Sequence, residues 1–254
     1  MCCIKRVLLK LSGESLSNGL LFIDKSTLFR TVSEISSVVL NNRVELAIVI
    51  GAGNIWRGTG KFIERVTADK MGMLATVMNA LALNDILIKS GLKSKIFSAN
   101  DVTGFVEKFS REKAIKQLEQ KKIVIFAGGT GNPFFTTDTA AALRAVEIKA
   151  DVLLKATQID GVYNLDPKKN KNAVKFASLT FQEALDRCLK VMDAEAFSLC
   201  MRMNIPIIVF DFYKDGNLKK ILNGEKIGTT VGGLGDANEK FFFNVRRSNE
   251  KNCK

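Results

Sequence analysis

Short apolar runs alternate along this chain with longer stretches in which apolar residues recur at helical spacing. The runs predict buried strands at 6–11, 44–50, 123–127, 151–157 and 206–211, with a shorter one at 95–97. The stretches between them predict helices at 26–42, 69–91, 111–120, 139–150, 180–189, 193–203 and 218–222. Strands that alternate with helices favour a mainly parallel sheet with helices on both faces. The predicted fold is therefore α/β, a three-layer α/β/α sandwich.

The same pattern bears on core packing and domain organisation. Along the longest predicted helix, we expect the inward-facing side chains to be Leu74, Val77, Met78, Leu81 and Ile88. No repeat or linker divides residues 1–232, so we expect a single domain there. From 233 to 254 the chain has glycines and mixed charges without periodicity, and its one apolar cluster is Phe241–Phe243. This segment is predicted to be a flexible C-terminal tail.

Glycine-rich loops follow two of the predicted strands. Residues 51–58 read Gly-Ala-Gly-Asn-Ile-Trp-Arg-Gly, and residues 128–138 read Gly-Gly-Thr-Gly-Asn-Pro-Phe-Phe-Thr-Thr-Asp, directly before a predicted helix. Glycines let the backbone approach a ligand closely, and the N–H groups at a helix start suit a phosphate. The second loop is equally compatible with an ordinary helix start that is capped by Thr137 or Asp138.

Lysines stand near the ends of two apolar strands, at Lys10 and Lys155. A lysine is rarely buried unless it is paired, so Lys10 either lies beside a ligand phosphate or extends to solvent from an edge strand. Ligands of parallel sheets bind beyond the carboxyl ends of the strands. The candidates that fall at these ends are Lys10, Gly13, Gly53, Arg57, Thr130, Asp138, Lys155 and Thr157. Their convergence predicts a nucleotide or phosphate site.

Composition narrows the chemistry further. The 254 residues include no histidine, which excludes Ser-His-Asp and Cys-His catalysis and histidine-ligated metals. Lysine, arginine, aspartate, threonine and backbone amides suit phosphoryl transfer. The net charge of +12 favours anionic partners, either nucleotides or nucleic acid. The 5 cysteines lack C-x-x-C spacing, which indicates free thiols in a reducing cytoplasm, and no apolar run approaches the roughly 18 residues that span a membrane.

The motifs resemble those of one enzyme family. A Walker A sequence is absent, which excludes the common P-loop nucleoside monophosphate kinases. The chain instead resembles the bacterial UMP kinases (uridylate kinases) of the amino acid kinase superfamily, over about residues 5–231. The matching segments are 10–14, 51–54 with 57–58, 69 with 71–76, 131–138, 155–157 with 160–163, and 191–193. The resemblance implies an amino acid kinase-like fold and transfer of the ATP γ-phosphoryl group to UMP with Mg²⁺, in pyrimidine nucleotide biosynthesis, by a homohexamer.

The resemblance also implies roles for particular residues. The implied catalytic residues are Lys10, Arg57 and Asp138. The implied ATP site comprises Lys10, Leu11, Ser12, Gly13, Gly53, Arg57, Lys155, Thr157, Tyr163 and Asp166. The implied UMP site comprises Ala52, Asp69, Thr130, Gly131, Asn132, Pro133, Phe134, Phe135, Thr136 and Thr137. Mg²⁺ is expected to be carried mainly by the nucleotide phosphates. Because the phosphate of UMP is already a nucleophile at neutral pH, the reaction needs no histidine base.

The chain departs from the family pattern in two respects. Ala52 replaces a middle glycine, and Asn84 and Ile88 stand where many members have an arginine and a histidine for an activating GTP. The second departure disfavours GTP activation through that arrangement.

Two alternatives stay open. One is an amino acid kinase-fold enzyme that phosphorylates a carboxylate or carbamate, which residues 131–138 disfavour. The other is a nucleic-acid-binding regulator, for which the sequence has no aromatic-basic motif.

Overall fold

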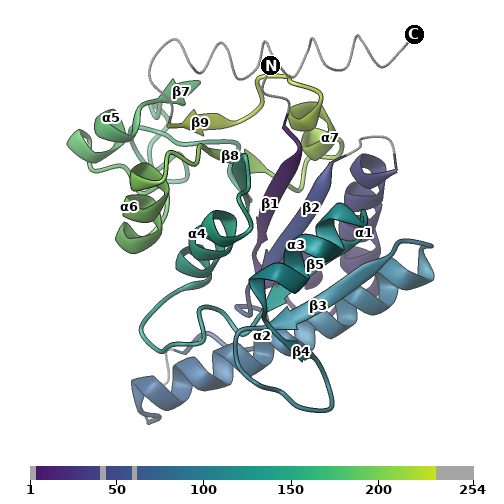
Figure 1. Cartoon of the computed structure of the whole chain (residues 1–254). Coiled ribbons are helices and arrows are strands. Elements are labelled where there is room, and N and C mark those ends of the chain that lie inside the picture. Colours follow the sequence, from purple (N-terminus) through teal and green to yellow (C-terminus); the bar gives the residue numbers. More distant parts are fainter. Residues whose placement is uncertain (1–3, 41–43, 59–61, 233–254) are drawn as a thin grey trace, which may run out of the picture.

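The sheet organises the whole molecule (Figure 1). The computed structural model describes residues 4–40, 44–58 and 62–232. The described strands form one nine-stranded sheet in the order β4-β3-β5-β2-β1-β6-β8-β9-β7. Their bounds are β1 Arg6–Leu11, β2 Glu45–Ile50, β3 Ser94–Ser98, β4 Glu107–Lys108, β5 Ile123–Ala127, β6 Val152–Thr157, β7 Ser178–Leu179, β8 Ile207–Asp211 and β9 Thr229–Val231. Neighbouring strands are parallel except for β8 and β9.

Helices cover both faces of this sheet, which confirms the predicted three-layer α/β fold. One face packs against α1 Lys25–Val39, α2 Arg65–Lys89 and α7 Asn217–Leu222. The other packs against α3 Arg111–Glu119, α4 Thr137–Glu147, α5 Phe181–Asp186 and α6 Ala194–Arg202. A 3₁₀ turn, η1 Gly13–Leu16, follows β1 directly.

The central strand β1 shows why the buried strands read as continuous apolar runs. Val7 and Leu9 belong to the core on the α1 and α2 face, whereas Leu8 belongs to the core on the α4 face. Because successive side chains of a strand point to opposite faces, a strand covered on both faces needs an apolar residue at nearly every position. Two positions of β1 break this rule: Arg6 at its start, which is buried and paired with Glu45, and Lys10 near its end, which is only partly buried.

Helix α2 differs from the expectation. Val77 is buried as predicted, together with Ala80, Leu83 and Leu87. The side chains of Leu74, Met78, Leu81 and Ile88, predicted to lie inside, are exposed by 57%, 54%, 37% and 54%. Helical spacing does not identify the inward face here, because apolar residues occur on two faces of this helix.

The prediction that no apolar segment is long enough to span a membrane also needs correction. By length and composition alone, α2 passes that test, with a mean hydropathy of 1.5. It packs against the sheet, however, and 44% of its apolar window is buried. A long core helix of a globular protein has these properties.

The expectations about the tail and about three of the cysteines concern residues that the structure does not describe. The predicted tail at 233–254, with Phe241–Phe243, lies outside them, as do Cys2, Cys3 and Cys253. Of the described cysteines, Cys188 is exposed and Cys200 is buried, and both are free thiols.

Candidate active site

Two lysines meet at the carboxyl edge of the sheet. Lys10 of β1 is the register partner of Lys155 of β6, so both side chains leave the sheet on the same face. This is the face that α4 covers, since Leu8 and Leu153, two residues earlier in each strand, pack in the core with the alanines of α4. The strand β1 is central in the sheet, which rules out a lysine that extends to solvent from an edge strand.

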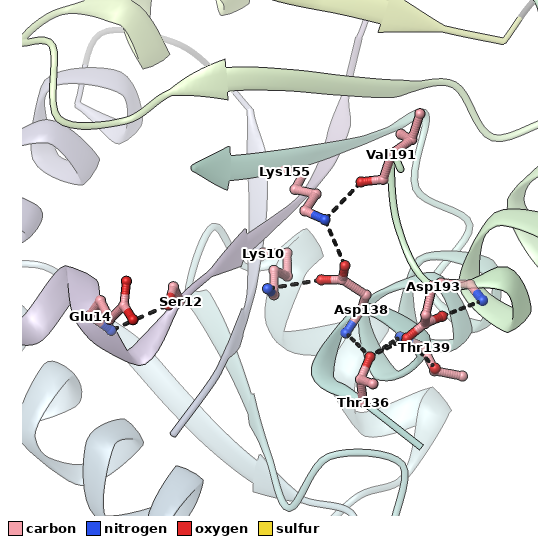
Figure 2. Close-up of polar contacts among 10 residues, drawn as sticks. Lys10, Ser12, Glu14, Thr136, Asp138, Thr139, Lys155, Val191 and Asp193 are labelled. Atoms are coloured by element: carbon pink, nitrogen blue, oxygen red, sulfur yellow. Dashed lines mark hydrogen bonds and ion pairs between the residues drawn. The ribbon is translucent and has the colours of Figure 1, made fainter. Parts of the chain in front are cut away.

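The first turn of α4 supplies the counter-ion. Asp138 Oδ1 lies 2.8 Å from Lys10 Nζ, and its Oδ2 lies 2.7 Å from Lys155 Nζ (Figure 2). Lys155 Nζ also donates to the Val191 carbonyl at 2.7 Å. Burial alone would raise the pKa of Asp138, but the two ammonium groups outweigh it and lower the pKa below its ordinary value. Asp138 is therefore ionised at neutral pH, and the three side chains carry a net positive charge.

The start of α4 is itself anchored. Thr136 caps the helix, because its hydroxyl accepts from the backbone N–H of Asp138 at 3.0 Å. The hydroxyls of Thr136 and Thr139 both donate to Asp193 Oδ2, the latter at 2.9 Å (Figure 2). Asp193 in turn caps α6. The sequence analysis placed Asp193 inside the helix predicted at 193–203 and gave it no role, whereas the structure makes it the residue that caps α6.

On the other side of Lys10, the loop 51–58 lies against η1. A Cβ atom on Gly13 would come 2.1 Å from Asn54 Oδ1 and 3.0 Å from the Gly51 carbonyl, so only glycine fits there. Arg57 Nη2 pairs with Glu14 Oε1 at 2.6 Å, and Arg57 Nε donates to the Gly53 carbonyl at 3.0 Å. Glu14 had no predicted role, because its pairing depends on two loops that are distant in sequence.

Cavities lie on both sides of this arrangement. On one side, two adjoining cavities of about 270 and 630 Å³ together form what we name the β6-side cavity. The predicted site residues that line this cavity are Lys10, Ser12, Lys155, Thr157, Tyr163 and Asp166. On the other side, the α2-side cavity of about 480 Å³ is lined by Ala52, Gly53, Arg57, Asp69, Thr130, Phe135, Thr136 and Thr137. Glu14 lines both cavities and thus lies at their junction.

Several predicted site residues do not line either cavity. The side chain of Leu11 is fully buried in the core, and Gly13 packs against the loop 51–58. Gly131, Asn132, Pro133 and Phe134 follow Thr130 on the same loop. The N–H of Phe134 donates to Asp69 Oδ2 at 2.8 Å, which ties this loop to α2. The individual roles assigned from the resemblance stay predictions.

Arg65 also joins the α2-side cavity, although sequence reasoning did not single it out. Its Nε donates to both oxygens of Asp69, at 2.9 and 2.8 Å. The two residues are four positions apart in α2, a spacing at which such pairs form, but the helix predicted from the sequence began at residue 69 and left Arg65 outside it. Asp69 is therefore fixed by Arg65 from its own helix and by the Phe134 N–H from the facing loop.

The fold and site define the class of protein. Residues 5–211 match the amino acid kinase family, and the chain belongs to that family. Within it, the chain is similar to the bacterial UMP kinases, as its motifs predicted. A UMP kinase from Bacillus anthracis matches with a TM-score of 0.88 and 36% identity, over 91% of this chain and 97% of that one.

Two further solved structures extend the comparison. The UMP kinase from Ureaplasma parvum matches with a TM-score of 0.86 and 36% identity, over 92% of this chain and 100% of that one. The uridylate kinase from Archaeoglobus fulgidus matches with a TM-score of 0.66 and 28% identity, over 89% of this chain and 99% of that one.

Proposed function

We propose that this chain is a UMP kinase, which transfers the γ-phosphoryl group of ATP to UMP and yields ADP and UDP. The observation that carries the proposal is the likeness to two UMP kinases, each 36% identical over 91% or more of this chain. The alternative of a kinase for carboxylates or carbamates is not favoured by these matches. We further propose that the enzyme acts in pyrimidine nucleotide biosynthesis in the cytoplasm.

The two cavities suit the two substrates. ATP would occupy the β6-side cavity and UMP the α2-side cavity, so that their phosphates meet near Lys10, Arg57 and Gly53. An oxygen of the UMP phosphate forms a bond to the γ-phosphorus, the bond from that phosphorus to the β,γ-bridging oxygen breaks, and ADP leaves. No proton has to be removed from the attacking phosphate. The main obstacle is the repulsion between two anions, which fixed cationic groups reduce.

The arrangement of the acidic side chains favours a metal ion that binds together with the nucleotide over one that the protein holds by itself. Among the described residues, no group of three or more His, Cys, Asp or Glu side chains could hold a metal ion. Asp138 is already engaged by two ammonium groups. Mg²⁺ is commonly held by substrate phosphates with only one or two carboxylates. We therefore propose that the ATP phosphates carry Mg²⁺, which neutralises part of their charge when it is bound.

The exposed face of α2 supports assembly of several copies. Met71, Leu74, Met78, Leu81 and Ile88 follow one another at spacings of three, four or seven residues and are all at least 36% exposed. A long stripe of exposed apolar side chains indicates an interaction surface. We propose that a second copy of the chain covers it, within the homohexamer that the resemblance implies.

Light scattering after size-exclusion chromatography tests this assembly. The variant Met78→Glu places a charge in the middle of the stripe and should lower the molar mass. Leu40→Glu, at an exposed apolar position at the end of α1, serves as the control and should leave the molar mass unchanged. A Met78→Glu protein with the wild-type mass would contradict the proposed interface.

Two variants test the proposed catalytic groups. We expect Lys10→Ala and Arg57→Ala each to slow ADP release from ATP and UMP by about 10²-fold or more, since each removes a cation near the meeting phosphates. Circular dichroism and thermal unfolding establish that the variants are folded. A near-wild-type rate in either folded variant would refute the role of that residue.

A further inference from the structure

A buried asparagine in the middle of α2 is not used by the mechanism above. Asn79 is completely buried and lines neither cavity. Its neighbours on the inward face of the helix are apolar, among them Ala80 and Leu83. A polar side chain in such a place must have its hydrogen bonds supplied by the protein. The groups that supply them indicate what Asn79 does.

Among the described residues, the side-chain hydrogen bonds of Asn79 all go to the loop 51–58. Its Nδ2 donates to the Gly51 carbonyl at 2.8 Å and to Asn54 Oδ1 at 2.8 Å. Its Oδ1 accepts from Asn54 Nδ2 at 3.0 Å. The two side-chain amides thus donate to and accept from each other. Helix α2 therefore holds the 51–58 loop at Gly51 and at Asn54.

The same amide pair reaches the turn after β1. Asn54 Oδ1 lies where a Cβ atom on Gly13 would be 2.1 Å away, so the loop and the turn are in close contact. Asn54 Nδ2 also donates to the Phe22 carbonyl at 2.6 Å. The positions of the 51–58 loop and of the Gly13 turn are therefore set against each other through the Asn54–Asn79 pair.

The loop carries the groups that matter for transfer. Gly53 adjoins Asn54, and Arg57 follows three residues after it, with its Nε bound to the Gly53 carbonyl. Ser12 and Glu14 flank Gly13 on the facing turn. A movement of the loop would therefore displace Arg57 relative to the turn, and a misplacement of about 1 Å in a reacting arrangement can cost about 10²-fold in rate.

We propose that Asn79 is a positioning residue for phosphoryl transfer, which acts through Asn54 and Gly51 to place Arg57 against the Gly13 turn. The proposal rests on the proposed UMP kinase function. Asn79 lines neither cavity, and the proposed transfer requires no proton from it. Its contribution is to fix the distance between the groups that line the two cavities.

The test compares Asn79→Ala with a matched change on the same helix. Asn84→Ala likewise removes one amide, which is partly buried and accepts from Ser94 Oγ at 2.8 Å, and Asn84 lies outside the site. We expect Asn79→Ala to lower kcat for UMP by about 10- to 100-fold and Asn84→Ala to leave it within about twofold. If Asn79→Ala does not fold, Asn54→Ala breaks the same pair from the loop side and should lower kcat in the same direction.

A second measurement separates positioning from general damage to the structure. In an Arg57→Ala background, Asn79→Ala should cause less than about a threefold further loss of kcat, because its effect passes through Arg57. If Asn79→Ala lowers kcat by the same factor in the Arg57→Ala background as in the wild type, the proposal is overturned. Equal losses in Asn79→Ala and Asn84→Ala would also overturn it.

A third measurement does not depend on activity. The chain has 1 tryptophan, Trp56, and it lies in this loop, where its Nε1 donates to the Ala68 carbonyl at 2.8 Å. We expect the emission of Trp56 to shift in Asn79→Ala but not in Asn84→Ala. An unchanged emission would contradict the proposal. Wild-type protein that does not turn over UMP would refute the proposed function instead, and the fluorescence comparison would still test the loop.

Discussion

The replacement of Asp138 by asparagine isolates the charge at the centre of the site. In the wild type, the carboxylate of Asp138 lies 2.8 Å from the ammonium group of Lys10 and 2.7 Å from that of Lys155. Asparagine keeps the size of the side chain but presents a neutral amide to both ammonium groups. Removing one partner from a buried ion pair costs about 3–5 kcal/mol. The side chains of Lys10 and Lys155 are 14% and 18% exposed to solvent, so we expect the loss of unfolding free energy to be near the lower end of this range, about 3 kcal/mol.

This free energy predicts a measurable shift in thermal unfolding. For a chain of this length, 1 kcal/mol changes Tm by about 2–4 °C, so Asp138→Asn should lower Tm by about 6–12 °C. ATP brings several negative charges to the same lysines, so saturating ATP should raise Tm more in the variant than in the wild type. Turnover should fall by about 10²-fold, because Lys10 loses the group that orients it.

The control is Asp186→Asn on α5, an exposed carboxylate that accepts a hydrogen bond from Gln182 at 2.7 Å. It should leave Tm within about 1–2 °C, as surface changes usually do. If Asp138→Asn unfolds at the wild-type Tm and keeps the wild-type rate, then the carboxylate neither stabilises the two lysines nor orients Lys10, and the reasoning is refuted.

Two further predictions follow from the same site. Because the folded-state pKa of Asp138 lies below its ordinary value of 3.8, its stabilising effect is complete above that value and is lost as the pH falls through the folded pKa. The difference in Tm between wild type and Asp138→Asn should therefore narrow below about pH 4 in unfolding scans, and a constant difference down to pH 2 would contradict this sign. Lys168 lines both parts of the β6-side cavity, so Lys168→Ala should raise KM for ATP by about two- to fivefold and leave KM for UMP unchanged. Lys171→Ala, on the same loop but outside the cavity, is the control, and equal effects of the two variants on KM for ATP would argue against a specific role.

The sheet was predictable because its strands obey a simple physical rule. A strand with helices on both faces must be apolar at nearly every position, and β1, β2, β5, β6 and β8 all show this run in the sequence. The parallel order follows from the helices between them. The short strands β4, β7 and β9, with only two or three residues each, give no such signal.

The convergence of Lys10, Lys155 and Asp138 was predictable only in part. A lysine near the end of an apolar strand indicated an unusual role, and the carboxyl edge of the sheet indicated where it would lie. The register that makes Lys10 and Lys155 partners follows from pairing between β1 and β6, which are far apart in the sequence. The spacing of residues along the chain carries no information about that pairing.

Contacts of the loops with distant segments, and the outward face of α2, could not be predicted from local patterns. The pairs Glu14–Arg57 and Asn54–Asn79 join segments that are 43 and 25 residues apart. In α2, residues such as Leu74 and Val77 are equally apolar, yet one is exposed and the other buried. Helical periodicity identifies two apolar faces in such a helix, but only the packing decides which one faces the sheet.

The most direct test of the account is a coupled ADP-release assay with ATP, Mg²⁺ and each of UMP, CMP, dTMP and GMP as the acceptor. We expect turnover with UMP and little with CMP or GMP, because a site that hydrogen-bonds one base discriminates strongly against a base with different hydrogen-bonding groups. Thymine has the same hydrogen-bonding groups as uracil, so discrimination against dTMP rests on its methyl group and its missing 2′-hydroxyl and should be weaker. Folded protein that turns over none of the four nucleotides, or that prefers one of the other three to UMP, would contradict the account.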